Sequence, residues 1–407
     1  MMMLPKIAWR NIWRSRTRSM VVIGSVVIGI WALIFLLGFF RGQVDNYVSN
    51  IIENETSHIQ IHDSLFKTDF EVRLFMPEAS KMVEELEADP DIKAVTSRLL
   101  VNGMLSSSAA VQGVMVKGVD MEQEIRVTRI SDKIIEGTSF DPEKRNQILI
   151  SERMAEKLKV GVRSKVVLTF QNIHGDISTG AFRISGIYKT SNRTSDELYV
   201  YTQISDMRRL TEVPPTGSHE IAMLVNNFAE TDTIASDLSK KFSPWKVETY
   251  KQISPDLELF NSQIRINMII MTVIFMLALI FGIINTMLMA VLERIKELGM
   301  LMAVGMNKMR VFFMVVLETI FIALIGAPIG MLLGYITTVY LNRVGIDLSN
   351  WSKALEEFGM SDIIRPTLTS ETFFTIVVAV IITAILASIY PALKAIRLKP
   401  VEALRKI

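Results

Sequence analysis

The chain has no cysteine and only four histidines among its 407 residues. The absence of cysteine excludes disulfide bonds, thiol catalysis, thiolate zinc sites and a lipid anchor on cysteine. Four histidines leave little material for a histidine-rich metal site. His58 and His62 lie four residues apart in a segment that alternates like a strand, and we interpret this pair as surface residues. We therefore expect no metal site.

Motifs of nucleotide hydrolysis and of hydrolytic catalysis are also absent. The chain has no GxxxxGK[ST] segment, whose backbone amides would cradle phosphates. It has neither HExxH nor GxSxG, so zinc-peptidase and serine-hydrolase sites have no support in the sequence. We predict that this chain holds no catalytic residue, binds no cofactor and does not itself hydrolyse ATP.

Charge is missing from four long stretches, although 21% of all residues are charged. A membrane helix needs about 20 mostly apolar residues to cross the hydrocarbon core. Four windows satisfy this condition, at residues 19–40, 266–292, 311–342 and 372–393, and Glu318 is the only charged residue in them. The first window is longer than the apolar part of a cleaved signal peptide, so we expect it to be retained. The sequence therefore predicts an integral membrane protein with four transmembrane helices.

The distribution of basic residues predicts the orientation of these helices. Residues 1–18 carry five Lys or Arg and no acid, the tail 394–407 carries five against one Glu, and the loop 293–310 carries four against two. Cytosolic flanks are enriched in Lys and Arg. We expect both termini and 293–310 in the cytosol, and segment 41–265 and the loop 343–371 outside it.

Segment 41–265 reads as a mixed α+β domain outside the cytosol. Its strand-like and helix-like stretches suggest one discontinuous α/β subdomain, at about 41–120 and 216–252, interrupted by a β-rich insert at about 121–215. Pro77 to Asp89 and Ser151 to Val160 read as helices, the second followed by Gly161 as a C-cap signal. No breaker separates residues 255–265 from the second membrane window, so we expect a stalk helix there.

Three shorter segments are expected at the cytosolic surface. Residues 1–18 predict an amphipathic interfacial helix with Trp9 and Trp13 at headgroup level. Residues 293–310 predict a compact helix that continues from the second span and ends at Gly305; its alternative is a plain connecting loop. We expect its apolar residues Leu298, Leu301 and Met302 to suit a soluble partner. The tail predicts a short helix that begins at Pro400, with Val401 and Leu404 as its apolar edge.

The third span carries a double small-xxx-small repeat. Gly326, Gly330 and Gly334 allow close contact between helices, and Pro328 between them would bend or loosen the helix. We expect Glu318 to pair or to face an interface rather than to relay protons. Four helices with one tight contact face are too few for a solute channel alone, so we expect the chain to dimerise.

Three segments resemble the FtsX-like permease superfamily, which includes MacB-type efflux permeases and Lol-type lipoprotein-releasing permeases. NIWRSRTR before the first span is similar to the family's basic entry, and ERIKELGMLMAVGM from Glu293 is similar to its coupling helix. YPALKAIRLKPVEALR from Tyr390 is similar to its C-terminal signature, with Pro391, Pro400, Glu402, Ala403 and Leu404 in matching positions. The resemblance covers the whole chain and is closest to the lipoprotein-releasing permeases.

The resemblance implies a division of labour between chains. A separate ABC ATPase, working as a dimer and carrying ATP and Mg²⁺, would dock on the 293–310 segment and on the N-terminal helix. The docking residues would be Glu293, Arg294, Lys296, Glu297, Leu298, Gly299 and Gly305. A second permease, identical or paralogous, would pair through spans one and two. ATP binding would close the stalks, and a porter and sabre domain would transmit the motion, a scheme called mechanotransmission.

Lipoprotein release from the bacterial inner membrane, with the large domain in the periplasm, is the leading functional hypothesis. A lipid-anchored substrate would enter from the bilayer and pass to a periplasmic carrier; no nucleic acid is involved. The residues that could face lipid or substrate are Val22, Val26, Ile30, Leu33, Ile270, Ile274 and Leu277. The alternatives are efflux or peptide export of the MacB type, and FtsX-like regulation of a cell-wall hydrolase.

Overall fold

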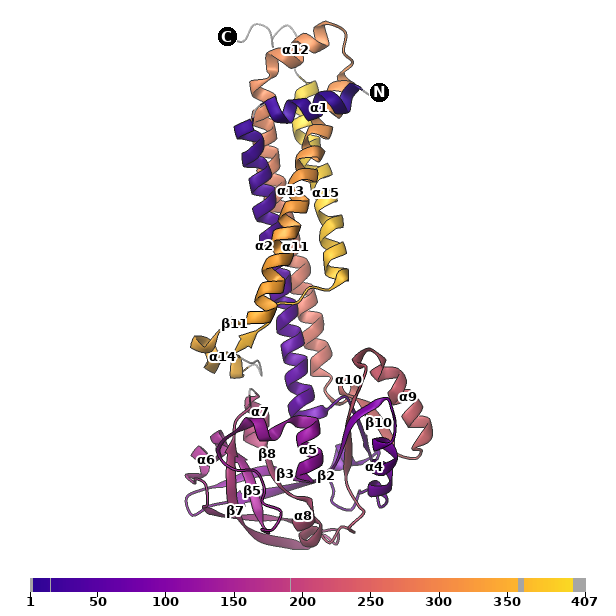
Figure 1. The fold of residues 1–407 in the computed structure, drawn as a ribbon, viewed down its shortest axis with the longest axis vertical. Coiled ribbons are helices and arrows are strands. Elements are labelled where there is room, and N and C mark those ends of the chain that lie inside the picture. Colours follow the sequence, from indigo (N-terminus) through magenta and orange to yellow (C-terminus); the bar gives the residue numbers. More distant parts are fainter. Residues whose placement is uncertain (1–2, 15, 191, 358–361, 398–407) are drawn as a thin grey trace. The chain divides into compact units, whose positions relative to one another are not determined.

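The computed structural model describes residues 3–14, 16–190, 192–357 and 362–397 (Figure 1). The chain divides into two compact units. The first, here called the membrane unit, comprises residues 1–44, 261–347 and 363–407. The second, here called the sheet domain, comprises residues 45–260 and 348–362. The predicted tail helix at Pro400 and the matching positions Pro400, Glu402, Ala403 and Leu404 lie outside the described residues.

Four helices in the described part of the chain are long and apolar enough to cross a membrane. They are α2 (Arg16–Ile51), α11 (Asp256–Glu293), α13 (Lys308–Val344) and α15 (Ser370–Ile396). The shorter elements between and before them are α1 (Met3–Arg14), α12 (Ile295–Ala303), β11 (Ile346–Asp347), η4 (Ser349–Trp351), α14 (Ser352–Glu357) and β12 (Ile363–Ile364). The prediction of a four-helix membrane protein with an α+β domain is confirmed.

The helices run beyond the apolar windows. Helix α2 continues past Phe40 to Ile51, and α11 begins at Asp256 and passes without a break through residues 255–265 into the apolar stretch. Helix α13 also continues through Pro328. Hydropathy marks only the part of a helix that lipid can cover, because the backbone hydrogen bonds are satisfied inside the helix on both sides of that boundary.

The three glycines of α13 form its contact with α2. A Cβ atom at Gly326 would lie 2.9 Å from Val26, one at Gly330 would lie 2.8 Å from the carbonyl oxygen of Val27, and one at Gly334 would lie 2.8 Å from Ile34. Only hydrogen fits at these positions, so the two backbones come unusually close. The repeat is therefore used within one chain.

Part of the surface that was predicted to face lipid is buried by this packing. Val22, Val26, Ile30 and Leu33 are at most 2% exposed, because that side of α2 belongs to the core of the membrane unit. The prediction that these four residues face lipid or substrate is wrong. By contrast, Ile270, Ile274 and Leu277 on α11 are 48%, 51% and 48% exposed.

The sheet domain contains ten strands in its described part. They are β1 (Ile59–His62), β2 (Ile92–Ser106), β3 (Val111–Val119), β4 (Ile134–Gly137), β5 (Gln147–Ser151), β6 (Lys165–Gln171), β7 (Ile177–Tyr188), β8 (Tyr199–Gln203), β9 (Glu220–Val225) and β10 (Lys246–Thr249). Their order is β10-β1-β9-β2-β3-β8-β5-β7-β4, and β6 pairs with β2 and β7. Pairing is antiparallel except between β3 and β8 and between β5 and β7.

Short helices connect these strands. They are η1 (Ile52–Thr56), α3 (Phe66–Asp69), α4 (Ala79–Glu87), α5 (Met121–Thr128), η2 (Ile130–Lys133), α6 (Glu152–Leu158), α7 (Arg193–Leu198), α8 (Ile204–Thr211), η3 (Phe228–Glu230), α9 (Thr231–Lys241) and α10 (Tyr250–Ile253). Helix α6 ends at Leu158, and its C-cap is Lys159, whose φ of 54° is left-handed, so the predicted C-cap at Gly161 is wrong by two residues. Helix α4 begins two residues after Pro77, which therefore lies outside its first turn.

Two hydrophobic cores share the long strand β2. Val95 belongs to the core formed with α4, β9 and α9, whereas Leu99 and Val101 belong to the core formed with β3, β5, β6 and β7. Arg98 stands between these two stretches of the strand and is 1% exposed. A buried cluster of charges therefore lies where the two cores meet.

The interpretation of the histidine pair as surface residues is wrong for His62. Strand β1 is buried along its whole length, and His62 is fully buried, with its Nε2 atom 2.9 Å from the Glu248 carboxylate. His62 is therefore not a surface residue; β1 is an inner strand that pairs with β9 and β10. Among the described residues, no group of three His, Asp or Glu side chains could hold a metal ion.

Candidate coupling site

The N-terminal helix α1 packs against the helices of the membrane unit through one face. Ala8 and Ile12 are fully buried, whereas Trp9 and Trp13 remain 45% and 43% exposed. The Trp9 ring meets the Phe321 ring edge-on at 5.8 Å between centroids. The alternation of small apolar, bulky aromatic and basic residues thus gives the amphipathic helix that the sequence predicts.

The second long helix and the coupling helix are separate elements. Helix α11 ends at Glu293, and α12 begins at Ile295 after a change of direction at Arg294, whose φ and ψ are −100° and 20°. The predicted direct continuation from the second span is therefore wrong. At this break the Arg294 side chain turns inward, where a carboxylate of α13 and a backbone carbonyl of α1 accept from it.

Arg294 connects three helices. Its Nη1 atom donates to the Glu318 carboxylate of α13 at 3.0 Å, and its Nη2 atom donates to the Asn11 carbonyl oxygen of α1 at 3.0 Å. The side chains of Arg294 and Glu318 are only 14% and 9% exposed. Breaking a pair of this kind leaves a desolvated charge, which is strongly destabilising. Arg294 therefore holds the start of α12 to α1 and α13 and is not free for a partner.

A second pair joins α12 to α1. The Arg14 guanidinium donates to both oxygens of Glu297, at 3.1 and 2.5 Å. Both side chains are well exposed, at 64% and 44%. An exposed pair contributes at most about 1 kcal/mol, so this contact orients the two helices and can rearrange at low cost.

The end of α12 is fixed by Gly305. The Gly305 amide donates to the Met302 carbonyl at 3.1 Å, and the Met306 amide donates to the Leu301 carbonyl at 3.0 Å. These two bonds form a Schellman motif, which needs a left-handed residue at its centre. Gly305 has a φ of 104°, so the glycine sets the turn that leads into α13.

The outward face of α12 differs from the one that the sequence suggested. Leu298 and Gly299 are buried, and Leu301 and Met302 pack against the core of the membrane unit, so these apolar residues do not offer a docking surface. Lys296, Met300 and Val304 are exposed, and their i, i+4, i+8 spacing puts them on one side of the helix. Met300 is 57% and Val304 85% exposed. We call these three residues the α12 ridge.

A cavity of about 340 Å³ lies beside the pairs just described. It is lined by α1, the end of α11, α12 and α13, and both Arg294 and Glu318 reach its wall. Figure 1 shows α1 and α12 at the same end of the membrane unit. The two carboxylates of its lining, Glu297 and Glu318, are each paired with an arginine. The arrangement thus connects an exposed helix to two long ones.

Fold and site together define a membrane protein whose long helices are tied to a small exposed helix. Comparison with protein families gives this class a name. Residues 19–241 match the MacB-like periplasmic core domain, and residues 269–400 match the FtsX-like permease C-terminal domain. The first match alone covers more than half of the chain. The chain therefore belongs to the family of MacB-type, FtsX-like ABC transporter permeases.

Individual relatives are distant. The chain is 23% identical to the macrolide export ATP-binding/permease protein MacB of Escherichia coli, over 86% of this chain but only 55% of that protein. It is 24% identical to the lipoprotein-releasing system transmembrane protein LolC of Neisseria meningitidis, over 95% and 94%. It is 21% identical to the uncharacterized ABC transporter permease YvrN of Bacillus subtilis, over 98% of both. The chain thus spans about half the length of the MacB relative.

Among solved structures, the periplasmic region of MacB from Actinobacillus actinomycetemcomitans is similar to this chain. The match covers 52% of this chain and 97% of that one, at 14% identity and a TM-score of 0.37.

Proposed function

We propose that this chain is the permease subunit of an ABC transporter that works by mechanotransmission, driven by a separate ATPase that docks on the α12 ridge. One observation carries the proposal: Arg294 ties the start of α12 to both α1 and α13. Since α11 ends one residue before Arg294, a force on α12 would reach α11 through the backbone and α13 through the buried ion pair.

The α12 ridge supports the docking part of the proposal. Met300 and Val304 are exposed apolar residues at the tip of a helix that is otherwise packed inward. A methionine beside an aliphatic residue forms an adaptable apolar contact, and Lys296 adds a positive charge at the same face. Of the residues predicted to dock the ATPase, Glu293, Lys296 and Gly305 are exposed, whereas Leu298 and Gly299 are buried.

The docking proposal is tested by purifying the full chain from its native membrane and measuring vanadate-sensitive ATPase activity that remains bound to it. Met300→Asp and Val304→Asp should each remove most of that activity, because a buried carboxylate in an apolar contact is not solvated. Met309→Asp is the matched control, since Met309 is 52% exposed at the first turn of α13, where a helix tolerates an acid. If Met300→Asp and Val304→Asp retain as much bound ATPase activity as the unmodified chain, α12 is excluded as the docking site.

The orientation and location also belong to the proposal. Both termini and α12 lie in the cytosol and the sheet domain lies in the periplasm of a bacterial inner membrane. The excess of Lys and Arg in 1–18 and 293–310 supports this orientation. A second permease pairs with the chain through α2 and α11, and the half-exposed residues Ile270, Ile274 and Leu277 contact this partner, lipid or an acyl chain of the substrate.

We propose lipoprotein release toward the outer membrane as the transport reaction. The end-to-end similarity to LolC, whose name describes a lipoprotein-releasing system, supports this choice. The substrate would be lipid-anchored and would pass to a periplasmic carrier. Mass spectrometry of the complex purified from its native membrane should identify bound lipoprotein; recovery of none, with ATPase activity that responds to small drugs, would overturn this reaction.

Efflux or peptide export is the second candidate function. It is favoured by the match of residues 19–241 to the MacB-like periplasmic core domain, and MacB of Escherichia coli is named for macrolide export. The same preparation distinguishes the two functions: stimulation of ATPase activity by a macrolide supports export, whereas stimulation by a lipoprotein supports release.

A further inference from the structure

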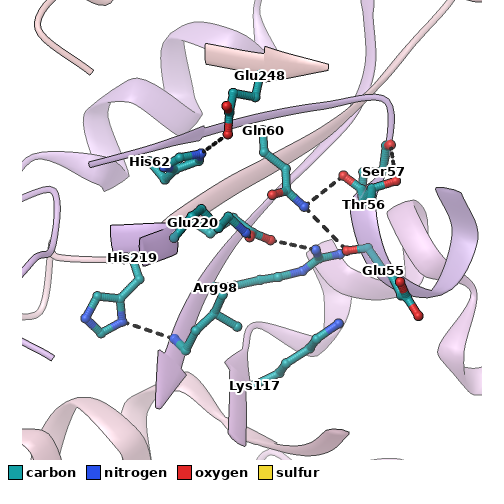
Figure 2. A network of polar contacts seen from close by, with 12 residues as sticks. Glu55, Thr56, Ser57, Gln60, His62, Arg98, Lys117, His219, Glu220 and Glu248 are labelled. Atoms are coloured by element: carbon teal, nitrogen blue, oxygen red, sulfur yellow. Dashed lines mark hydrogen bonds and ion pairs between the residues drawn. The ribbon is translucent and has the colours of Figure 1, made fainter. Parts of the chain in front are cut away.

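The sheet domain contains a polar cavity of about 380 Å³. Strands β1, β3, β8, β9 and β10 contribute to its wall, together with η1 and the residues that follow α10. Figure 2 shows the charged and polar side chains around this space, with Gln60 and Glu248 on one side and Lys117 on the other. A volume of this size is at the lower end of the range for small-molecule sites.

One wall of the cavity provides unused hydrogen-bond donors. Lys117 is 3% exposed, and its Nζ atom donates to the Asn54 carbonyl oxygen at 3.3 Å and lies 3.7 Å from the centre of the Tyr199 ring. An ammonium has three N–H groups, and the described contacts use one in a hydrogen bond and place the Tyr199 ring against the amine. Burial lowers the pKa of Lys117 to about 8, so the amine is still mostly charged at neutral pH.

The opposite wall provides an unused acceptor. Gln60 is 1% exposed; its Nε2 atom donates to the Thr56 carbonyl oxygen at 2.9 Å, which fixes the amide, and its Oε1 atom has no hydrogen-bond partner among the described residues. Leaving a buried acceptor unpaired costs about 1–3 kcal/mol. The carboxylates of Glu220 and Glu248 line the same cavity from the two strands that pair with β1.

The charges of the two walls determine which ligand fits. The carboxylates of the lining are already paired, Glu220 with Lys67 and Arg98, and Glu248 with Lys246 and His62. A simple anion would therefore gain Lys117 but meet the Gln60 oxygen, and a simple cation would gain the Gln60 oxygen but meet Lys117. Either would gain on one side and be repelled on the other. A molecule that carries both a protonated amine and an anionic group satisfies both walls at once.

We propose that this cavity binds a small zwitterion, whose ammonium group donates to the Gln60 Oε1 atom beside the paired carboxylates of Glu220 and Glu248, and whose carboxylate or phosphate accepts from Lys117. The amino and carboxyl groups of a short peptide have this chemistry, and so has a phosphoethanolamine headgroup. The site goes beyond the transport function proposed above and does not depend on it, because binding is measured without an ATPase or transport.

A bound ligand would also contact the segments that lead into the long helices α2 and α11. Thr56 and Ser254 both line the cavity; Thr56 lies five residues after the end of α2, and Ser254 lies two residues before the start of α11. A bound ligand should therefore slow hydrogen exchange at η1 and α10 in particular, which gives a second readout on the unmodified chain.

Isothermal titration of the detergent-solubilised full chain tests the proposal. The probes are glycylglycine and glycerophosphoethanolamine, with N-acetylglycinamide as a neutral control. We expect saturable binding of at least one zwitterion and none of the neutral compound, and the tighter zwitterion distinguishes a peptide from a headgroup. Lys117→Met and Gln60→Met should each weaken binding about tenfold or more. Lys240→Met should leave it unchanged, because Lys240 is exposed on α9.

Several results would overturn the proposal. These are no saturable binding of either zwitterion, equal binding of the neutral compound, or unchanged affinity in both Lys117→Met and Gln60→Met. If these variants fail to fold, hydrogen exchange on the unmodified chain decides: protection of residues 52–56 and 250–254 by a zwitterion that binds saturably supports the site, and absence of protection contradicts it.

Discussion

The guanidinium of Arg294 lies 3.0 Å from the carboxylate of Glu318, with both side chains nearly buried between α12 and α13. Glu318 is the only charged residue in the four apolar windows, and a carboxylate at such a position needs a partner to stay ionised. Arg294 supplies it from the residue that separates α11 from α12. The charge of Glu318 within a membrane helix is thus part of the ion pair that connects α12 to the long helices.

Replacement of Glu318 by Gln should weaken the connection between α12 and α13. The substitution leaves the Arg294 charge buried without its partner, which costs up to about 3–5 kcal/mol, so the thermal midpoint of the detergent-solubilised chain should fall. Arg294→Gln should have a similar effect. The double variant should be less destabilised than the sum of the two, since it removes both charges. Strictly additive effects would show that the two side chains do not interact.

Gly330→Ala should disrupt the contact between α2 and α13. A Cβ atom at Gly330 would lie 2.8 Å from the Val27 carbonyl oxygen, whereas one at Gly282 would meet nothing within 4 Å. Overpacking of this kind typically costs about 1–3 kcal/mol. The thermal midpoint should therefore drop for Gly330→Ala and stay close to that of the unmodified chain for Gly282→Ala. Equal midpoints would mean that the glycine contact is not used.

The sheet domain should lose stability in mild acid through His219. The Leu100 amide donates to its Nδ1 atom at 3.1 Å, and its Nε2 atom lies 2.8 Å from the Val72 carbonyl oxygen, so the neutral ring is fully bonded. Burial lowers the pKa of His219 from 6.5 to about 4. Because the folded pKa is the lower one, the stabilisation is complete above about pH 6.5 and is lost as the pH falls toward 4.

Unfolding of the sheet domain, followed by circular dichroism at several pH values, measures this effect. His219→Asn keeps an acceptor for the Leu100 amide and removes the titrating group. The variant should be less stable at pH 7 and should lose less stability between pH 6.5 and 4 than the unmodified chain. His58, whose pKa burial also lowers to about 4, retains part of the slope. An unchanged slope in the variant would rule out His219 as a contributor.

The membrane helices could be predicted from the sequence because the thickness of the bilayer fixes the length of an apolar window. Which side of a helix meets lipid could not. Val26 and Ile274 are equally apolar, yet the first is buried against Gly326 and the second is half exposed. A side chain packed on a neighbouring helix and one packed on lipid have the same hydropathy, so only the partner's glycine stripe could have indicated the difference.

The sequence singled out the segment that contains Arg294, but not the contacts that its residues make. Arg294 lies in the family-like segment, and its bond to Glu318 spans 24 residues, a distance at which sequence shows no pairing. The sequence did give one indication: Glu318 is the only acid in the third span, and the loop 293–310 before that span is basic. The cavity of the sheet domain had no such signal, because Gln60 and Lys117 come from strands that pairing through β9 and β2 brings together.

The strand β2 was missed for a related reason. Its residues from Ala94 to Val101 are buried without alternation, and they include Arg98. Arg98 is neutralised by Glu124 and Glu220, at 2.9 Å each, from α5 and β9. A buried arginine balanced by distant acids looks like a surface residue in sequence, so the strand that joins the two cores had no clear pattern.

The central claim is that α12 faces the cytosol while the sheet domain lies on the other side of the membrane. The absence of native cysteine allows a direct measurement. Val304→Cys places a thiol on the α12 ridge, and Ser108→Cys places one at the exposed turn between β2 and β3. A membrane-impermeant maleimide added to intact spheroplasts should label Ser108→Cys, and should label Val304→Cys only after a denaturing detergent has opened the membrane and removed a docked ATPase. Labelling of Val304→Cys in intact spheroplasts would contradict the account.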